Sequence, residues 1–307
     1  MANRPNVLEQ LRDRLDEIFG EPTAASVWGS LSQPKAQTYW LNPLQPRPDS
    51  FAPFGKRLEG FDGAYHVDHV DRESVTRHAG ASDGWLYPIN PSSLLAVRVL
   101  DAREGEEILD LAAAPGGKTL GIAASMHNTG RIAAVEVVKA RFHRLRANLK
   151  RCGVTNTTFY LADGRSIGRK VPGRFDRVLL DAPCSSEARI RLADPTTYAH
   201  WKPRKIRETA RKQVGLLRSA FQALKPGGVL VYCTCAFAPQ ENELVVDALL
   251  SSGVDAEVEP IDVADVPSLP GFNTWQDKTL DPRIERAVRV LPDALWDGFF
   301  VCRLRKG

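Results

Sequence analysis

The segment of residues 108–119, ILDLAAAPGGKT, constrains the fold of this chain more than any other stretch. It opens with apolar residues and Asp110, which is the pattern of a buried strand and its end. The Pro-Gly-Gly that follows permits a tight turn and a close approach of the backbone to a ligand, because glycine has no Cβ atom. Residues 119–126 are apolar enough to begin a helix, whose free N–H groups would face the same ligand. This order predicts a ligand loop at the carboxyl end of a parallel sheet.

Two classes of ligand are compatible with this loop. Residues 112–119 follow a relaxed phosphate-loop pattern, in which Ala112 replaces the first glycine of G-x-x-x-x-G-K-[ST]. On that interpretation the chain is a nucleoside triphosphatase, with Lys118 on the phosphates and Asp181 as the metal-binding acid. The alternative is a loop for S-adenosylmethionine, in which Asp110 and the turn hold the methionine end of the cofactor. The choice between the two depends on the downstream sequence.

Residues 1–83 predict a small α+β unit in front of the main domain. An amphipathic helix is expected over residues 6–20. Residues 38–41 have the composition of a short strand, but the Pro- and Gly-rich region around them is expected to be a small appended unit rather than part of a regular sheet. Residues 65–75 alternate in polarity and are expected to be strand. The pair His66 and His69 lies in that segment without a nearby Cys or third His at a recognisable spacing, so no metal site is expected.

Residues 84–307 alternate between strand and helix patterns. This alternation predicts one α/β domain with a doubly wound, mostly parallel sheet and helices on both faces. The expected strands are 107–111, 132–136, 158–162, 175–180 and 229–233, with a terminal strand pair at 289–291 and 299–304. The expected helices are 91–100, 119–126, 139–152, 206–224 and 241–250.

Acidic residues lie at the ends of four successive strands: Asp110, Glu136, Asp163 and Asp181. In a doubly wound sheet they would share one crevice. Glu136 follows Asp110 by 26 residues, and an acid about 20–30 residues past the turn is the usual ligand of ribose hydroxyls. Acids often cap helices after strands, but four in succession favour a nucleoside-containing cofactor.

Two of the five cysteines follow strands that end at the same crevice. Cys184 lies in Asp-Ala-Pro-Cys after the fourth strand, and Cys235 lies in Cys-Thr-Cys after the fifth. A partly exposed thiolate with a lowered pKa is a strong nucleophile toward carbon. A single cysteine is more often a small buried apolar residue, but two such loops on neighbouring strands favour a chemical role. Cys152 and Cys302 are expected to be structural.

The composition is that of an ordinary globular protein, with 43% hydrophobic and 25% charged residues among 307 and a net charge of +4. A charge this small is weak support for a polyanionic partner. An odd number of cysteines in a chain of this length does not form a disulfide scaffold. There is no apolar signal core and no run of membrane-spanning length. We therefore expect a cytoplasmic protein without membrane contact.

Three loops resemble the signature loops of the RsmB/Sun-type RNA (cytosine-5)-methyltransferases: residues 110–119 (DLAAAPGGKT), residues 181–185 (DAPCS) and Thr234-Cys235. Flanking matches are residues 87–93 (YPINPSS), 225–228 (KPGG), 239–243 (PQENE) and 297–300 (DGFF). The resemblance covers residues 84–307. It implies a Rossmann-like, seven-stranded class I methyltransferase domain, preceded by an RNA-binding-type unit over residues 1–83.

The resemblance also implies the function and the site. The chain would methylate C5 of a cytosine in ribosomal or transfer RNA with S-adenosylmethionine as cofactor. Cys235 would attack C6 of the base, Cys184 would assist the later elimination, and Asp181 would hydrogen-bond the ring near N3. The cofactor would be held by Asp181, by Glu136 on the ribose, by Asp163 near the adenine, and by the turn Ala112, Ala113, Ala114, Pro115, Gly116, Gly117 and Lys118.

This chain departs from the family pattern at several positions. It has Ala236 where the family usually has Ser after Thr-Cys, and Cys233 where the family has Ser. Residues 186–189 (SEAR) follow the DAPCS loop, where the family often continues with Gly. These departures keep a catalytically silent RNA-binding relative open as an alternative. We expect a monomer with no RNA-binding domain added after the catalytic part, so RNA would contact basic segments at residues 141–151, 202–212 and 303–306. The target cytosine would have to be unpaired or flipped out.

Overall fold

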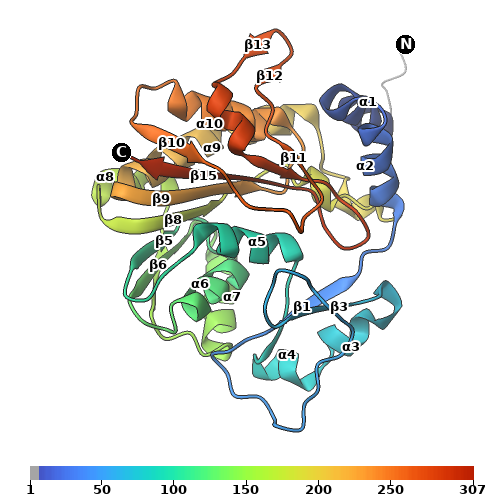
Figure 1. Ribbon diagram of the computed structural model, residues 1–307, viewed down its shortest axis with the longest axis vertical. Coiled ribbons are helices and arrows are strands. Elements are labelled where there is room, and N and C mark those ends of the chain that lie inside the picture. The colour runs from blue at the N-terminus through green and yellow to red at the C-terminus, as the bar shows by residue number, and fades with distance from the viewer. Residues whose placement is uncertain (1–6) are drawn as a thin grey trace.

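A computed structural model describes residues 7–307 and shows one large central sheet with helices on both faces (Figure 1). Five strands are parallel in the order β7-β6-β5-β8-β9. They are β5 (Glu107–Asp110), β6 (Arg131–Glu136), β7 (Thr157–Leu161), β8 (Phe175–Asp181) and β9 (Leu224–Thr234). This order changes direction between β5 and β8, where the crevice of a doubly wound sheet forms.

Four antiparallel strands extend the sheet beyond β9: β15 (Phe299–Lys306), β14 (Val288–Val290), β11 (Ser268–Pro270) and β10 (Ala256–Glu259). The strands β14 and β10 pair with the first and the last residues of β15, on the edge of β15 opposite β9. The doubly wound α/β prediction is confirmed. Within residues 7–307 this sheet has nine strands rather than seven, because the short strands β10 and β11 pair with β15 and β14. Each is only three or four residues long, which is too short to stand out as a strand in the sequence.

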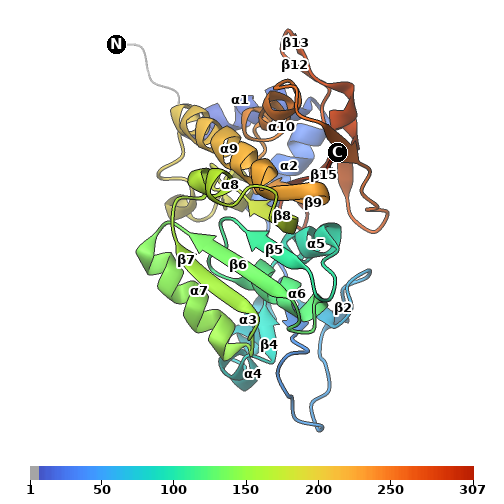
Figure 2. The same cartoon turned by 90° about the vertical axis from the view of Figure 1, so that its left-hand side faces the viewer.

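Three helices cover each face of the parallel sheet (Figures 1 and 2). One face carries α5 (Pro91–Leu100), α6 (Gly117–Ser125) and α7 (Lys139–Arg151), and the other carries α8 (Ile167–Lys170), α9 (Pro203–Ala223) and α10 (Glu243–Leu250). Successive residues of a strand point to opposite faces. Leu179 therefore packs with the α5 side, whereas Val178 and Leu180 pack with the α9 side.

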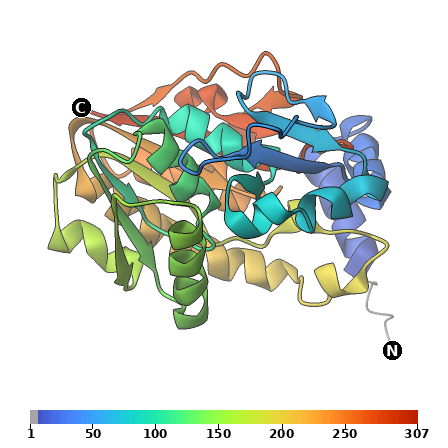
Figure 3. The ribbon, with the colours of Figure 1, turned by 90° about the horizontal axis from the view of Figure 1, so that it is seen from below.

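Residues 7–88 form two substructures, a helix pair and a small sheet, which lie on either side of the carboxyl ends of the parallel strands. Helices α1 (Val7–Phe19) and α2 (Thr23–Ser32) pack near the loops of the α10 side, and their buried positions include Leu11 and Leu15. A four-stranded antiparallel sheet, β2-β3-β1-β4, lies on the α5 side (Figure 3). Its strands are β1 (Gln37–Leu41), β2 (Lys56–Arg57), β3 (Ala64–Val67) and β4 (Leu86–Pro88).

Two expectations about this region need correction. Residues 65–75 are not one strand, because β3 ends at Val67 and is followed by a 3-10 turn (His69–Asp71) and the helix α3 (Arg72–Thr76). In that helical turn Val75 is the buried position. The strand-like segment at residues 38–41 belongs to a regular sheet, since β1 pairs with both β3 and β4. Because β4 and the helix α4 (Ala79–Asp83) flank residue 84, the small sheet includes residues on both sides of the expected domain boundary.

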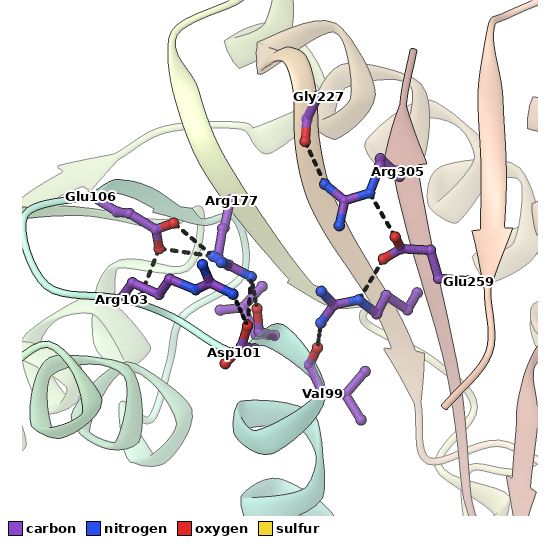
Figure 4. A network of polar contacts seen from close by, with 10 residues as sticks. Val99, Asp101, Arg103, Glu106, Arg177, Gly227, Glu259 and Arg305 are labelled. Carbon is purple, nitrogen blue, oxygen red and sulfur yellow. Dashed lines mark hydrogen bonds and ion pairs between the residues drawn. The ribbon is translucent and has the colours of Figure 1, made fainter. Parts of the chain in front are cut away.

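A network of charged side chains holds the amino ends of the strands, opposite the crevice (Figure 4). The Arg177 guanidinium on β8 is buried, and its Nε donates to both oxygens of Glu106 at 3.0 and 2.8 Å, just before β5. Arg303 and Arg305 on β15 both donate to Glu259 on β10. The basic tail at residues 303–306 is therefore used in sheet contacts, and the structure does not bring it to the crevice. None of the helices within residues 7–307 is long and apolar enough to cross a bilayer.

Candidate active site

A cavity of about 580 Å³ opens at the carboxyl ends of β5, β8 and β9. Its walls come from three parts of the chain: the segment before and into α5, the turn after β5, and the two cysteine loops. The lining residues are Tyr87, Pro88, Ile89, Asn90, Ser93, Asp110, Ala112, Ala113, Ala114, Pro115, Gly117, Lys118, Arg141, Asp181, Ala182, Pro183, Cys184, Ser186, Arg189, Cys235 and Asp297. Most of the residues predicted from the sequence thus surround one space.

The turn after β5 places backbone and small side chains against this cavity. Gly116 has φ of 111°, a conformation that strongly favours glycine, and α6 starts at the next residue. Asp110 is buried at the strand end and accepts a hydrogen bond of 2.6 Å from the Thr119 hydroxyl. Burial raises the pKa of Asp110 from 3.8 to about 7, although the Thr119 hydrogen bond acts in the opposite direction. A ligand ammonium group would compensate for the desolvation of this carboxyl group.

The Lys118 side chain is buried in the cavity wall, where its ammonium group is hydrogen-bonded. Its Nζ donates to Asp181 Oδ2 at 2.7 Å and to the Ser93 hydroxyl at 3.2 Å. Burial alone would lower the pKa of Lys118, but the charges of Asp181 and Cys233 and the hydrogen bond to Asp181 together outweigh burial and raise the pKa above 10.5. A phosphate-binding lysine would have to leave both partners, so this arrangement does not fit the nucleoside triphosphatase interpretation.

The two cysteine loops bring their sulfur atoms into contact. Cys184 Sγ and Cys235 Sγ are 3.3 Å apart, and both side chains are half-buried at the cavity wall. The Ser186 hydroxyl lies 3.6 Å from Cys235 Sγ and 3.9 Å from Cys184 Sγ. The hydrogen bond from Cys184 lowers the pKa of Cys235 from 9.0 to about 7 despite its burial, and the charge of Arg189 adds to this effect. The same contact and burial raise the pKa of Cys184.

Cys233, two residues before Cys235, lies within the strand β9, whereas Cys235 follows the end of that strand. It is fully buried, its thiol donates to Asp181 Oδ1 at 3.7 Å, and burial raises its pKa well above 9.0. Cys152 and Cys302 are also buried. Cys184 and Cys235 are therefore the cysteines that face the cavity within residues 7–307.

Two buried carboxylates hold the cysteine loops in place, and neither was singled out in the sequence. Glu241 accepts from the Ser185 backbone N–H at 2.9 Å and from Gln213 at 3.1 Å, directly behind Cys184. Glu187 accepts from the backbone N–H groups of Phe237 and Ala238 at 3.1 and 2.9 Å, just after Cys235. The segment PQENE contains Glu241, so the flanking match was the signal that could have identified it.

Glu136 is the last residue of β6 and Asp163 follows β7, and neither is among the residues that line the cavity. Glu136 is 2% exposed, and its Oε1 accepts from the Val138 N–H at 2.8 Å. Within residues 7–307 its Oε2 has no hydrogen-bond donor, and the Arg141 guanidinium is 3.6 Å away. This orphaned carboxylate oxygen fits the hydroxyls of a cofactor ribose. Asp163 is different, because both of its oxygens accept from Arg165.

Asn90, Ser93, Arg189 and Asp297 also line the cavity, although they were not predicted as site residues. Asp297 accepts from Asn90 Nδ2 and from Arg191 Nη2, each at 2.6 Å. Asn90, Ser93 and Asp297 belong to the flanking matches YPINPSS and DGFF, whereas Arg189 lies in the segment that departs from the family. Residues 7–307 hold no cluster of three or more His, Cys, Asp or Glu side chains suited to a metal ion.

Comparison with known proteins gives the family. The profile of the 16S rRNA methyltransferase RsmB/F family matches residues 97–305. The chain is 42% identical over 226 residues to ribosomal RNA small subunit methyltransferase F from Pectobacterium carotovorum, covering 73% of this chain and 45% of that protein. It is 39% identical over 263 residues to the Escherichia coli protein of the same name, covering 83% and 53%. The chain thus spans about half the length of these curated relatives.

Solved structures agree with this fold. The crystal structure of a methyltransferase homologue from Pyrococcus horikoshii superposes with a TM-score of 0.80 at 29% identity, over 99% of this chain and 100% of that chain. The structure of PH0851 gives the same TM-score at 26% identity, over 99% and 70%. The class I methyltransferase fold is confirmed, and S-adenosylmethionine, the predicted cofactor, is the one this family uses. The chain belongs to the RsmB/F family of 16S rRNA methyltransferases.

Proposed function

We propose that this chain transfers a methyl group from S-adenosylmethionine to C5 of a cytosine in ribosomal RNA through a covalent bond between Cys235 and C6. The observation that carries the proposal is the 3.3 Å contact between Cys184 Sγ and Cys235 Sγ, in a cavity that residues of the glycine turn also line. The names of the curated relatives favour ribosomal over transfer RNA. A ribosomal substrate would place the protein in the cytoplasm, where we propose that it acts as a monomer.

Cys235 begins the reaction as a thiolate. Its Sγ forms a bond to C6, the π electrons of the C5–C6 bond make C5 nucleophilic, and the negative charge spreads toward N3 and O2. Asp181 hydrogen-bonds the ring at N3, and Lys118, 2.7 Å from Asp181, is the proton reserve for that position. When bound, S-adenosylmethionine supplies the methyl group. A base at the site then takes the C5 proton, the electrons of the C5–H bond restore the C5–C6 double bond, and the S–C6 bond breaks as Cys235 leaves as a thiolate. Cys184 assists this elimination, and the proton held at N3 returns to Asp181.

The residues present are suited to the cofactor. The turn from Ala112 to Lys118 offers backbone groups and little side-chain bulk, and the free Oε2 of Glu136 would accept from the ribose hydroxyls. Asp163 would lie near the adenine while remaining paired with Arg165. Asp181 would contact both the cofactor and the target base. We further propose that residues 84–307 form the catalytic domain and that residues 1–83 are an RNA-binding unit closely packed on it.

The test is methyl transfer with labelled cofactor and unmodified 16S rRNA. We expect label at C5 of a cytosine, loss of transfer by at least 10³-fold in Cys235→Ala, and accumulation of a covalent protein–RNA adduct in Cys184→Ala. Transfer that survives in Cys235→Ala would refute the assignment of the nucleophile. RNA binding without any transfer by the unmodified protein would instead support a catalytically silent relative.

A further inference from the structure

A second cavity of about 540 Å³ adjoins the catalytic cavity. Pro88, Ile89, Asn90 and Asp297 line both spaces. The segment from the end of α2 into β1 lines the second cavity, and so do Arg191 and Ala193. We call this space the flanking groove. An RNA strand that places one base in the catalytic cavity has to continue past the mouth of that cavity, which this groove adjoins.

The flanking groove has a positive lining. Lys35, Arg72 and Arg191 contribute cationic groups, and His69 is at the rim. The Arg72 side chain is exposed, whereas Lys35 is partly buried and donates to the carbonyl oxygens of Asp293 and Trp296. Asp297 contributes a negative charge, but its carboxylate is already hydrogen-bonded to Asn90 and Arg191. The net charge of these groups is positive, so it favours the binding of a phosphate, the group that dominates protein contacts with nucleic acids.

Thr38 gives an independent indication of a ligand. It lines the flanking groove, it is 2% exposed, and its Oγ1 has no hydrogen-bond partner within residues 7–307. Its position is fixed, since its carbonyl oxygen accepts from the Ile89 N–H at 3.1 Å across the small sheet. A buried hydroxyl without a partner is costly. A ligand that fills the groove would supply the missing hydrogen bond.

We propose that the flanking groove binds the nucleotide adjacent to the target cytosine in single-stranded RNA. Its phosphate would lie among Lys35, Arg72 and Arg191, and a polar atom of its sugar or base would hydrogen-bond the Thr38 hydroxyl. This inference rests on the proposed function, because an extruded cytosine in the catalytic cavity leaves its neighbour at the shared wall. It assigns to the N-terminal unit a direct part in positioning the substrate.

Binding and crosslinking test the inference without requiring turnover. The probe is a fluorescein-labelled 12-nucleotide oligouridine with one central cytosine, and affinity is read from fluorescence anisotropy. We expect Thr38→Val and Arg72→Gln each to raise Kd by about 5- to 10-fold. A 4-thiouridine next to the cytosine should crosslink to peptides that contain residues 31–38 or 69–72. On 16S rRNA, Arg72→Gln should raise KM and leave kcat unchanged.

Matched controls separate a binding role from a folding defect. Thr157→Val removes another threonine hydroxyl that has no partner, and Arg103→Gln removes an exposed charge from the amino end of β5, so both should bind as the unmodified protein does. Thr38→Val should not lower the Tm. Unchanged Kd in Thr38→Val and Arg72→Gln, alongside normal methylation by the unmodified protein, would overturn this inference alone. Failure of the unmodified protein to methylate rRNA would overturn the proposed function and this inference with it.

Discussion

Ser186 combines backbone strain with a position at the centre of the site. Its φ is +61°, a left-handed conformation that costs a non-glycine residue roughly 1–2 kcal/mol. The family resemblance implies Gly at this position, and glycine adopts that conformation freely. In this chain the Ser186 hydroxyl lies 3.6 Å from Cys235 Sγ. The Cβ atom of Ser186 therefore lowers stability through backbone strain, whereas its hydroxyl can donate a hydrogen bond to the Cys235 thiolate.

Replacing Ser186 should separate these two effects. The Cys235 pKa is lowered to about 7, so its thiolate forms as the pH rises through 7, and alkylation by iodoacetamide should level off above about pH 8. In Ser186→Gly we expect this midpoint to move up, by less than the loss of the Cys184 hydrogen bond would move it, because the hydroxyl no longer stabilises the thiolate. The free energy of unfolding should rise by about 1 kcal/mol, because the strain is relieved. Mass spectrometry of the Cys235 peptide and urea denaturation measure the two quantities.

Ser186→Ala is the control for this experiment. It removes the hydroxyl but keeps the Cβ atom, so it should raise the alkylation midpoint as Ser186→Gly does without the gain in stability. An unchanged midpoint in both variants would show that the Ser186 hydroxyl has no part in ionising Cys235.

At the scale of elements, the sequence predicted the helices and strands whose ends are set by neighbouring residues. The helix α5 runs from Pro91 to Leu100 as expected, because Asn90 caps it and Pro91 suits its first position. The cavity residues were predictable because parallel strands deliver their carboxyl ends to one edge. The contact of Arg191 with Asp297, 106 residues away, has no local signal. Strand β10 was missed for the same reason, since its pairing with β15 depends on partners distant in the sequence.

The register of β8 next to β5 depends on such a distant contact, between Arg177 and Glu106. Arg177→Met keeps the length of the side chain but leaves Glu106 without its main partner, and it should lower the free energy of unfolding by about 3 kcal/mol. Arg174→Met is the matched control, because the Arg174–Glu107 pair is far more exposed and should contribute less than about 1 kcal/mol. Urea denaturation measures both variants. Equal losses in the two would show that the buried pair does not hold these strands together.

At the scale of the whole molecule, the N-terminal helices α1 and α2 pack against the two loops that carry Cys184 and Cys235. Leu11 and Leu15 of α1 belong to the same buried cluster as Ala188 and Phe237, which follow Cys184 and Cys235. Arg14, also on α1, donates to Glu187 Oε1 at 3.3 Å, and Glu187 in turn holds the loop after Cys235. Residues far from the cavity in sequence therefore pack against the loops that carry the two sulfur atoms.

This coupling predicts that a cavity in the α1 packing changes the chemistry of Cys235. Leu15→Ala removes a fully buried side chain and should lower the free energy of unfolding by about 2–5 kcal/mol. Because the Cys184–Cys235 hydrogen bond depends on the loops that this cluster supports, the alkylation midpoint of Cys235 should also rise above 7. Leu86→Ala is the matched control: Leu86 is equally buried but lies in the core of the small sheet, away from both cysteine loops. Leu86→Ala should lower the free energy of unfolding by a comparable amount and leave the alkylation midpoint of Cys235 near 7. Equal midpoints in the two variants would show that α1 stabilises the fold without supporting the site.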